Sequence, residues 1–329
     1  MNNQYLLNKN ILFISPSFFG YENDIIKELN KSGAKVIYIK EIENISRWKY
    51  FLRRYIRKQW KKSLLKTIKL NQFDFLFVIK GSSFDDEVIN IFSYLDCKKI
   101  LYQYDSILRY PNILKLIPHF NETFTFEYDD YERYKNLGLK FRPLFFCNNF
   151  KKEILDFNKY KISSVCSFYP ERMAIMNKLI NIIGNKGLYL YIYISKTLLI
   201  KKLLNNSIIN FKYLKTKKLK REKLIKIMSM SDCILDIKNK EQKGLTMRTF
   251  ETIGMGKKLI TNNDSISKYN FYNPNNIFIL KEDNVLDINN FLSVEMIKIP
   301  QNIIKIYNIN HWCKDIFLNK DKNTKYLNS

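Results

Sequence analysis

The chain has 329 residues, of which 46% are hydrophobic and 15% aromatic, and a formal net charge of +25. This length suits two α/β domains of about 150 residues each, and the hydrophobic content excludes an intrinsically disordered chain. No apolar run reaches the roughly 18 residues of a membrane span, and the N-terminus lacks the basic leader and apolar core of a signal peptide. We therefore expect a folded protein of the cytoplasm.

The positive charge requires an anionic partner or surface, but abundant Lys, Asn and Ile are also typical of an AT-rich genome, so charge alone assigns no function. Five cysteines stand singly along the chain and are typical of buried, reduced thiols. His119 and His311 cannot supply a histidine-rich metal cluster, and the adjacent acids at 85–86 and 129–130 suit turns or helix caps. We expect no bound metal and no cofactor.

The first half of the chain alternates short apolar segments with amphipathic ones. Strands are expected at 10–15, 35–39, 74–80, 99–104, 123–126 and 141–145, and helices at 22–31, 88–94 and 130–136. This order predicts a parallel sheet covered by helices. The first strand is not followed by Gly-x-Gly-x-x-Gly, so dinucleotide binding at that turn is unsupported.

One acidic residue of this half occupies a position that favours a catalytic role. Asp105 comes directly after the strand at 99–104, and the carboxyl ends of parallel strands form the ligand-binding edge of an open α/β sheet. Asp105 is therefore a candidate general base or partner of an acceptor hydroxyl. Capping of the helix that follows is the alternative role for Asp105 and Ser106.

The segment 46–70 is strongly basic and contains no acidic residue. Its apolar and aromatic residues fall on one face of a helix and most of its cations on the other. Such a helix suits an anionic membrane surface. A nucleic-acid patch and simple docking of the helix on its own sheet are the alternatives, and membrane contact would suit an enzyme with a lipid-linked acceptor.

The second half repeats the alternation after a polar, lysine-rich linker at 148–161. Strands are expected at 162–167, 188–194, 233–237, 258–261 and 276–280, with helices after 170, at 196–204, before 231, at 246–255 and at 308–319. The chain thus divides into domains at 1–150 and 160–306. We expect the last helix, 308–320, to cross back to the first domain.

The stretch from Asp232 to Asp264 carries the densest set of candidate ligand-binding groups. Its helix starts at the carboxyl edge of the second sheet, where backbone N–H groups and the helix dipole attract phosphate. A guanidinium suits phosphate oxygens, and a carboxylate suits a ribose or sugar diol. A solvated ion pair on the helix surface is the alternative for the charged residues. The candidates are Lys243, Gly244, Thr246, Arg248, Glu251 and Asn262.

The run Gly-Leu-Thr-Met-Arg-Thr-Phe-Glu-Thr-Ile-Gly-Met-Gly at 244–256 resembles the donor-binding segment of GT-B glycosyltransferases, in the variant of CgeB-type and polysaccharide-biosynthesis enzymes. The resemblance implies an α/β fold of two Rossmann-like domains that face a central cleft. It also implies that Glu251 holds the nucleotide ribose or donor sugar, and that Arg172 contacts the donor diphosphate. A helix-surface arginine is the alternative for Arg172.

The function implied is metal-independent glycosyl transfer from a nucleotide sugar to a cell-surface polysaccharide, such as lipopolysaccharide or O-antigen, or to a lipid-linked glycan. The expected partners are therefore a nucleotide-sugar donor and a glycan acceptor, with a possible anionic membrane at 46–70 and no nucleic acid. A nucleotide-sugar epimerase of the same fold is one alternative. A non-enzymatic basic protein that binds membrane or nucleic acid is the other.

Overall fold

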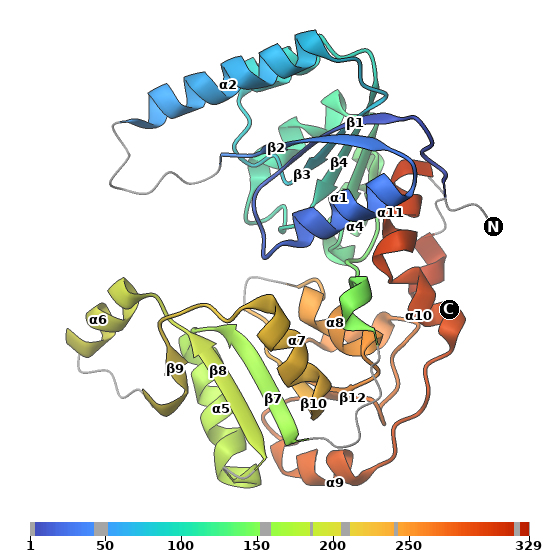
Figure 1. Ribbon diagram of the computed structural model, residues 1–329. Coiled ribbons are helices and arrows are strands. Elements are labelled where there is room, and N and C mark those ends of the chain that lie inside the picture. The colour runs from blue at the N-terminus through green and yellow to red at the C-terminus, as the bar shows by residue number, and fades with distance from the viewer. Residues whose placement is uncertain are drawn as a thin grey trace. The chain divides into compact units, whose positions relative to one another are not determined.

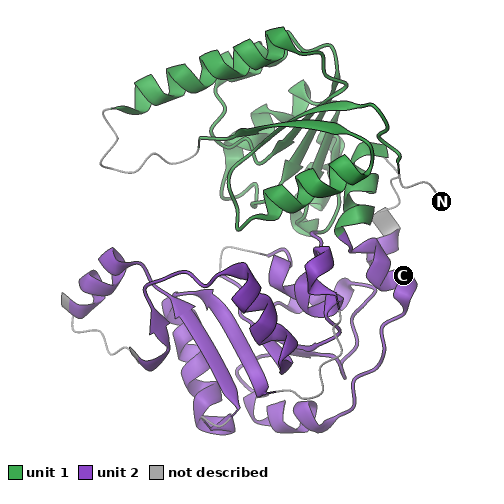
Figure 2. Ribbon diagram, in the orientation of Figure 1, with its two compact units in different colours: residues 1–143, 309–323 green, residues 144–308, 324–329 purple. Residues whose placement is uncertain are grey.

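A computed structural model describes residues 4–42, 52–151, 159–184, 187–204, 211–239, 243–318 and 323–328. The chain forms two compact units (Figure 2). Unit 1 comprises Met1–Pro143 and Ile309–Asn323, and unit 2 comprises Leu144–Asn308 and Thr324–Ser329. Each unit contains one six-stranded sheet, and every described strand pairing is parallel.

Unit 1 has the strand order β2-β1-β3-β4-β5-β6. The chain moves from β1 to one edge and then returns to build the other side, so the topological switch point lies between β1 and β3. Ligands of open α/β sheets bind beyond the carboxyl ends of the strands at such a point. The strands are β1 (Asn10–Ser15), β2 (Lys35–Lys40), β3 (Phe75–Ile79), β4 (Lys98–Gln103), β5 (Glu122–Thr125) and β6 (Leu139–Phe141).

Helices cover both faces of this sheet, which explains the continuous apolar run of its inner strand β3 (Figure 1). On one face Leu12 and Leu76 join a core with residues of α2 and α3. On the other face Phe77 packs between Phe13 and Trp312 of α11, with ring centroids 5.1 and 6.1 Å away. The helices are α1 (Tyr21–Lys31), α2 (Arg53–Leu70), α3 (Asp86–Phe92), α4 (Tyr128–Tyr134) and α11 (Ile309–Leu318), with 3-10 turns at Pro111–Lys115, Ile117–His119 and Lys135–Leu137.

The basic helix α2 docks on unit 1 through its C-terminal half. Leu64 and Ile68 are buried in the core shared with the sheet, and the Trp60 indole N–H donates to the Lys40 carbonyl at 2.8 Å. The first turns extend beyond the strands in Figure 1, and Tyr55 there is 62% exposed. Docking on its own sheet therefore accounts for half of the helix, while positions 46–51 of the predicted basic segment lie outside the described residues.

Unit 2 has the strand order β12-β11-β10-β7-β8-β9, which places its switch point between β7 and β10. The strands are β7 (Tyr160–Ser167), β8 (Leu188–Tyr193), β9 (Leu214–Lys215), β10 (Ser231–Asp236), β11 (Lys258–Thr261) and β12 (Ile277–Ile279). The helices are α5 (Pro170–Ile183), α6 (Lys196–Leu204), α7 (Arg221–Ser229), α8 (Met247–Gly254), α9 (Ile288–Ser293) and α10 (Gln301–Ile306). Further 3-10 turns lie at Asn148–Phe150, Phe211–Tyr213, Asp264–Lys268, Val285–Asp287 and Asn323–Tyr326.

An aromatic cluster fixes α8 within unit 2. The Phe250 ring lies 5.3 Å from that of Tyr307 and 6.1 Å from that of Phe271. At the end of the helix, a Cβ on Gly254 would lie 2.6 Å from ring atoms of Phe146 and 2.8 Å from the Phe150 carbonyl oxygen. Only a residue without a side chain permits this approach of the helix to Phe146.

Most expected elements coincide with observed ones, and the strand 258–261 does so at both ends. The strand expected at 141–145 is wrong in position, because β6 ends at Phe141 and Pro143 follows, which has no N–H to donate to a strand ladder. The short β9 was not expected. Its two residues are too few for a periodic signal.

Candidate nucleotide-sugar site in unit 2

The candidate site lies at the switch point of unit 2, where two loops leave the carboxyl ends of neighbouring strands. One loop joins β7 to α5, and the other joins β10 to α8. The second loop is described at its two ends, at 237–239 and from Lys243 onward. Four of the residues predicted from sequence, Arg172, Thr246, Arg248 and Glu251, lie on the helices that follow these strands.

Arg172 joins the two strand ends. Its Nε donates to the Ile237 carbonyl at 2.7 Å, and its Nη1 donates to the Ser167 carbonyl at 3.1 Å. Its guanidinium also lies over the Tyr169 ring, 4.9 Å from the centroid. Arg172 is thus held at both strand ends, and among the described residues no acceptor is found for its other N–H groups.

The start of α8 is tied to the end of β10 by an acid that the sequence analysis left without a role. The Asp236 carboxylate accepts hydrogen bonds from the Thr246 hydroxyl and, at 3.3 Å, from the Thr249 hydroxyl. Thr246 is also the N-cap of the helix, since its side-chain oxygen accepts from the Thr249 N–H at 3.4 Å. Thr246 therefore positions the helix start and directs its own hydroxyl proton to Asp236.

Arg248 and Glu251 form an ion pair, with 2.6 Å between Nη1 and Oε2. The Glu251 side chain has 0% exposure, and that of Arg248 has 18%, so this is a largely buried pair rather than a solvated one on the helix surface. Arg248 Nη1 also lies 2.8 Å from the Met228 sulfur. Glu251 holds the Arg248 guanidinium near the helix start, whereas the sugar-diol role expected for Glu251 stays a prediction.

Several charged groups of this region act electrostatically on the thiol of Cys166, near the end of β7. Burial raises the pKa of Cys166, the positive charges of Arg172 and Arg248 act to lower it, and the negative charge of Asp236 acts to raise it. A single thiol therefore lies within electrostatic reach of both arginines and of the acid. Arg172 and Arg248 come from different helices but share one neighbourhood at the switch point.

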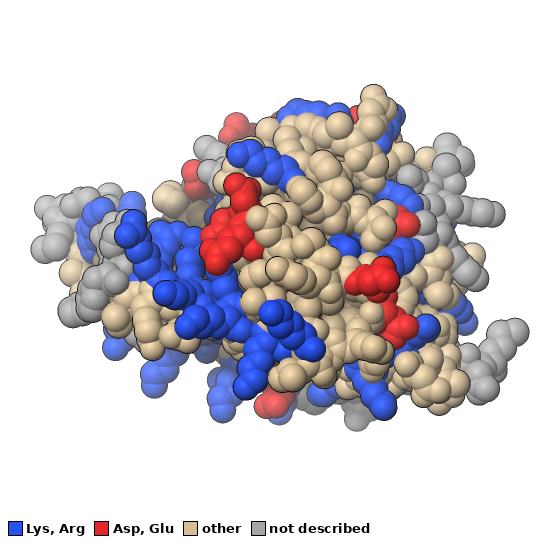
Figure 3. Space-filling view, turned by 90° about the horizontal axis from the view of Figure 1, so that it is seen from above, with Lys and Arg blue, Asp and Glu red and all other residues tan. Residues whose placement is uncertain are grey.

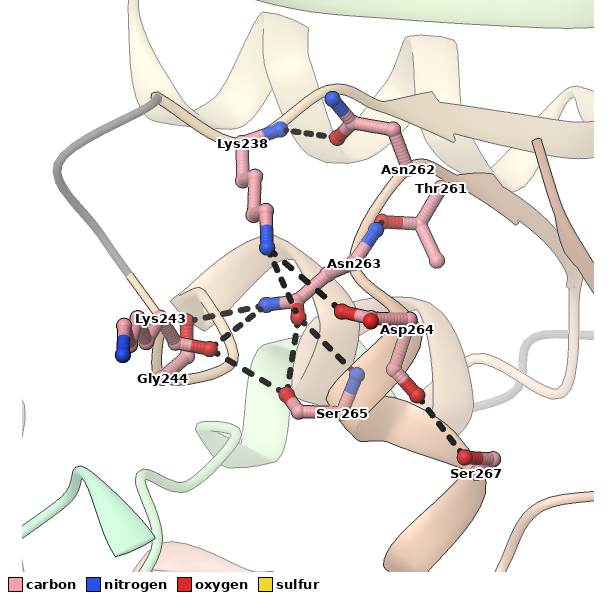
Figure 4. Close-up of polar contacts among 9 residues, drawn as sticks. All are labelled: Lys238, Lys243, Gly244, Thr261, Asn262, Asn263, Asp264, Ser265 and Ser267. Atoms are coloured by element: carbon pink, nitrogen blue, oxygen red, sulfur yellow. Dashed lines mark hydrogen bonds and ion pairs between the residues drawn. The ribbon is translucent and has the colours of Figure 1, made fainter. Parts of the chain in front are cut away.

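A second group of polar contacts surrounds Asn263, just after β11 (Figure 4). Asn263 is buried, and its amide donates to the carbonyls of Lys243 at 3.0 Å and Gly244 at 3.2 Å. The neighbouring Asn262 accepts from the Lys238 N–H at 2.8 Å. The two asparagines thus hold both described ends of the loop between β10 and α8.

These contacts also give roles to three residues predicted as ligand-binding. Lys243 and Gly244 contribute carbonyls to the Asn263 network, and the Lys243 side chain points away from it in Figure 4. The side-chain oxygen of Asn262 accepts a hydrogen bond from the loop. Sequence reasoning missed Asn263 and Asp236, although their positions directly after β11 and at the end of β10 were a usable signal.

Asp105 belongs to unit 1, at the carboxyl edge of that sheet. Its carboxylate forms an ion pair with Lys80 at 2.8 Å, and the Lys80 ammonium lies over the Tyr110 ring, 4.7 Å from the centroid. Neither Lys80 nor Tyr110 was predicted. The pair spans the ends of β3 and β4 and fixes the carboxylate beside a cation.

Backbone strain marks the same edge of unit 1. Among the described residues other than glycine, positive φ angles occur at Asn8, Phe19 and Lys80, and the last two lie on the loops that follow β1 and β3. Such conformations are costly and tend to persist at functional sites. Phe19 is also 75% exposed. The switch point of unit 1 therefore carries features of a ligand-binding edge as well.

In the described part of the chain, no group of three His, Cys, Asp or Glu residues could hold a metal ion. Likewise, none of the described helices is long and apolar enough to cross a bilayer.

Known structures share this architecture across nearly the whole chain. Staphylococcus aureus MnaA with UDP aligns with a TM-score of 0.56 and 12% identity, covering 94% of this chain and 97% of that chain. UDP-GlcNAc 2-epimerase from Neisseria meningitidis, bound to UDP-GlcNAc, gives 0.56 and 9%, covering 94% and 99%. The Methanocaldococcus jannaschii UDP-GlcNAc 2-epimerase with UDP-GlcNAc and UDP gives 0.51 and 12%, covering 90% and 99%.

No protein-family model matches the sequence, and no curated protein matches it either. At these low identities the structural likeness establishes the fold alone. The chain is an α/β protein with two Rossmann-like parallel sheets, which is the architecture of the GT-B fold.

Proposed function

We propose that this chain is a glycosyltransferase that moves a sugar from a nucleotide-activated donor to a cell-surface polysaccharide or lipid-linked glycan. The donor binds at the switch point of unit 2, and the acceptor binds at the carboxyl edge of unit 1. We also propose that the protein works in the cytoplasm, that its reaction needs no metal ion, and that it is related to CgeB-type enzymes.

The observation that carries the proposal is the pair of fixed arginines at the switch point of unit 2. A transferase must stabilise the negative charge that develops on a departing diphosphate. Arg172 and Arg248 come from different helices, and each is held in place by contacts within unit 2. Because both are positioned before a ligand arrives, they can meet the developing charge without reorganisation.

Unit 1 supplies the acceptor side in this proposal. Asp105 accepts the proton of the attacking hydroxyl, and Lys80 keeps its carboxylate oriented. The exposed Phe19 offers an apolar surface on the neighbouring loop. Asp105 and Lys80 belong to unit 1, whereas the arginines proposed to bind the donor belong to unit 2.

A second candidate function is epimerisation of a nucleotide sugar. The names of the aligned structures favour it, since UDP-GlcNAc 2-epimerases and a UDP complex are among them. An epimerase uses the same donor site but needs no acceptor, and it retains the nucleotide–sugar bond in its product. Asp105, Lys80 and the acids near the switch points would then act on the sugar itself.

One assay separates the two functions. The protein is incubated with UDP-, GDP- and CMP-sugars, with and without glycan acceptors, and the products are followed by mass spectrometry and NMR. Glycosyl transfer predicts free nucleotide that accumulates only with an acceptor. A nucleotide sugar whose ring configuration changes without an acceptor would establish the epimerase instead, and no reaction or binding with any donor would contradict both.

A further inference from the structure

Unit 1 contains a cavity of about 290 Å³ beside the loop that follows β3. Its lining is polar and includes two arginines of α2, with Phe84 and Tyr110 as the aromatic part. A volume at the low end for small-molecule sites suits a group about the size of one sugar phosphate. The polar residues that concern us are Arg53, Arg57, Ser82, Ser83 and Asn112.

Along one face of α2, the cations have fewer acidic partners with each turn toward the N-terminus of the helix. Lys61 pairs with Asp85 and Glu87. One turn earlier, Arg57 donates to the uncharged Ser83 carbonyl. A further turn back, Arg53 forms no ion pair or hydrogen bond with any described residue and lines the cavity. The cavity is therefore lined by one arginine, Arg53, that has no acidic partner among the described residues.

The acid in the lining lies within electrostatic reach of Arg57 but forms its ion pair with Lys61. Asp85 is the N-cap of α3, where it accepts from the Val88 N–H at 3.1 Å, and its other oxygen lies 2.8 Å from the Lys61 ammonium. Its charge is thus already compensated from within the fold. Figure 3 shows Lys and Arg side chains gathered over α2, with a group of acidic side chains beside them.

Unused hydrogen-bonding groups line the same cavity. Among the described residues, the side chains of Ser82 and Asn112 and the Tyr110 hydroxyl have no hydrogen-bond partner. The loop that presents Ser82 is fixed by the buried Glu41, which accepts from the Gly81 N–H at 3.1 Å and the Ser83 hydroxyl at 2.7 Å. The cavity therefore combines a loop held by Glu41 with donors that have no acceptor among the described residues.

The charges at the start of α2 also favour the binding of an anion. Its first turn has no acidic residue, and Leu52 at the N-cap provides no side-chain hydrogen bond. Cations at Arg53 and Arg54 face the positive end of the helix dipole, which is the unfavourable arrangement. A bound anion beside Arg53 would relieve this repulsion.

We propose that this cavity binds the phosphate or diphosphate group of the acceptor, with Arg53 and Arg57 as its guanidinium ligands and Ser82 and Asn112 as hydrogen-bond donors. The arginines present planar N–H pairs that match phosphate oxygens. The assignment of the ligand to an acceptor rests on the proposed glycosyl transfer. Tyr110 connects the cavity to the reaction, because its ring also contacts Lys80, the partner of Asp105.

The test uses pyrophosphate as the probe at constant ionic strength. Isothermal titration calorimetry compares the wild-type protein with Arg53→Gln, Arg54→Gln and Arg172→Gln, and TROSY NMR follows the backbone amides of Ser82 and Ser83. Arg54 is the matched control, because it is an exposed cation in the same turn but does not line the cavity. Arg53 makes no hydrogen bond or ion pair with a described residue, so its replacement should leave the fold intact.

We expect Arg53→Gln to weaken pyrophosphate binding at this site about tenfold, the effect of one lost charged hydrogen bond, and to reduce the amide shifts of Ser82 and Ser83. Arg54→Gln should leave both unchanged. Equal effects of Arg53→Gln and Arg54→Gln would overturn the pocket. If only Arg172→Gln abolished binding, pyrophosphate would bind at the donor site in unit 2 and not in the cavity, which would overturn this proposal. If only Arg53→Gln abolished binding, pyrophosphate would bind in the cavity, which would support it.

Discussion

The Arg248 guanidinium and the Glu251 carboxylate lie 2.6 Å apart, and the Glu251 side chain has no exposure to solvent. A surface ion pair one helical turn apart contributes a few tenths of a kcal/mol to the free energy of unfolding, but removing the partner of a buried carboxylate costs more. Glu251 therefore determines where the Arg248 guanidinium lies. The pair couples the stability of α8 to the geometry of the candidate site.

Glu251→Gln should lower both stability and nucleotide binding. The amide keeps the shape but removes the charge that balances Arg248, which should cost about 2 kcal/mol of unfolding free energy. Urea unfolding and calorimetric titration with UDP measure the two effects. Glu222→Gln, an exposed substitution on α7, is the control. Unchanged stability of Glu251→Gln would show that the pair does not hold the helix.

Asn263→Asp should weaken nucleotide binding indirectly, because Asn263 holds the loop between β10 and α8 rather than the ligand itself. The substitution replaces an N–H₂ that donates to two loop carbonyls with a carboxylate that repels them. We expect a loss of about 2 kcal/mol in stability and a nucleotide affinity reduced about tenfold. Ser267→Ala, which removes one exposed local hydrogen bond, should have neither effect. Equal affinity in both variants would rule out a positioning role for Asn263.

Gly254→Ala tests the close packing of α8. In an ordinary helix the change would stabilise, because alanine is the better helix former. Here the new methyl group would lie 2.6 Å from the Phe146 ring, so we expect destabilisation by about 1 to 3 kcal/mol. Thermal unfolding decides the sign. The control is Asn177→Ala on the exposed face of α5, which should change stability by less than about 0.5 kcal/mol.

Asp130 gives the fold of unit 1 a pH dependence. Burial raises the pKa of Asp130 to about 6, while its Oδ2 accepts from the Ile107 N–H at 2.8 Å on the loop that carries Asp105. The folded state thus binds the proton more tightly than the unfolded state, whose pKa is about 4. The stabilisation from this group is complete below pH ~4 and is lost as pH rises through 6.

Asp130→Asn should remove that dependence. Relative to the variant, the wild-type protein should lose about 1 to 2 kcal/mol of unfolding free energy between pH 4 and 7, after allowance for partial solvent screening. Urea unfolding across this pH range measures the difference, and Asp129→Asn on the exposed side of α4 controls for the loss of one carboxylate. A difference that rises with pH would contradict the assignment.

The fold could largely be predicted because its signals are local. Apolar runs of four to six residues, such as that of β3, alternate with amphipathic helices, and this alternation in itself indicates parallel sheets. Strand order could not be obtained in the same way. Nothing in the residues of β10 states that it lies beside β7 rather than β9, because that choice depends on contacts between distant segments.

The candidate site was predictable in position but not in its contacts. A helix start after a strand end pointed to Thr246 and Arg248, whereas the burial of Glu251 depends on how α8 packs in the fold. The bond of Arg172 to the Ile237 carbonyl joins residues far apart in sequence, and the same holds for the bonds of Asn263 to the loop. Spacing along the chain carries no signal for such pairs.

The central claim is that Arg172 and Arg248 hold the diphosphate of a nucleotide sugar. The most direct measurement is calorimetric titration of UDP, GDP and CMP into the wild-type protein and into Arg172→Gln and Arg248→Gln. We expect one nucleotide to bind, and each substitution to weaken it about tenfold or more, as lost charged hydrogen bonds to phosphate require. Binding that survives both substitutions, or no binding of any nucleotide, would contradict the account.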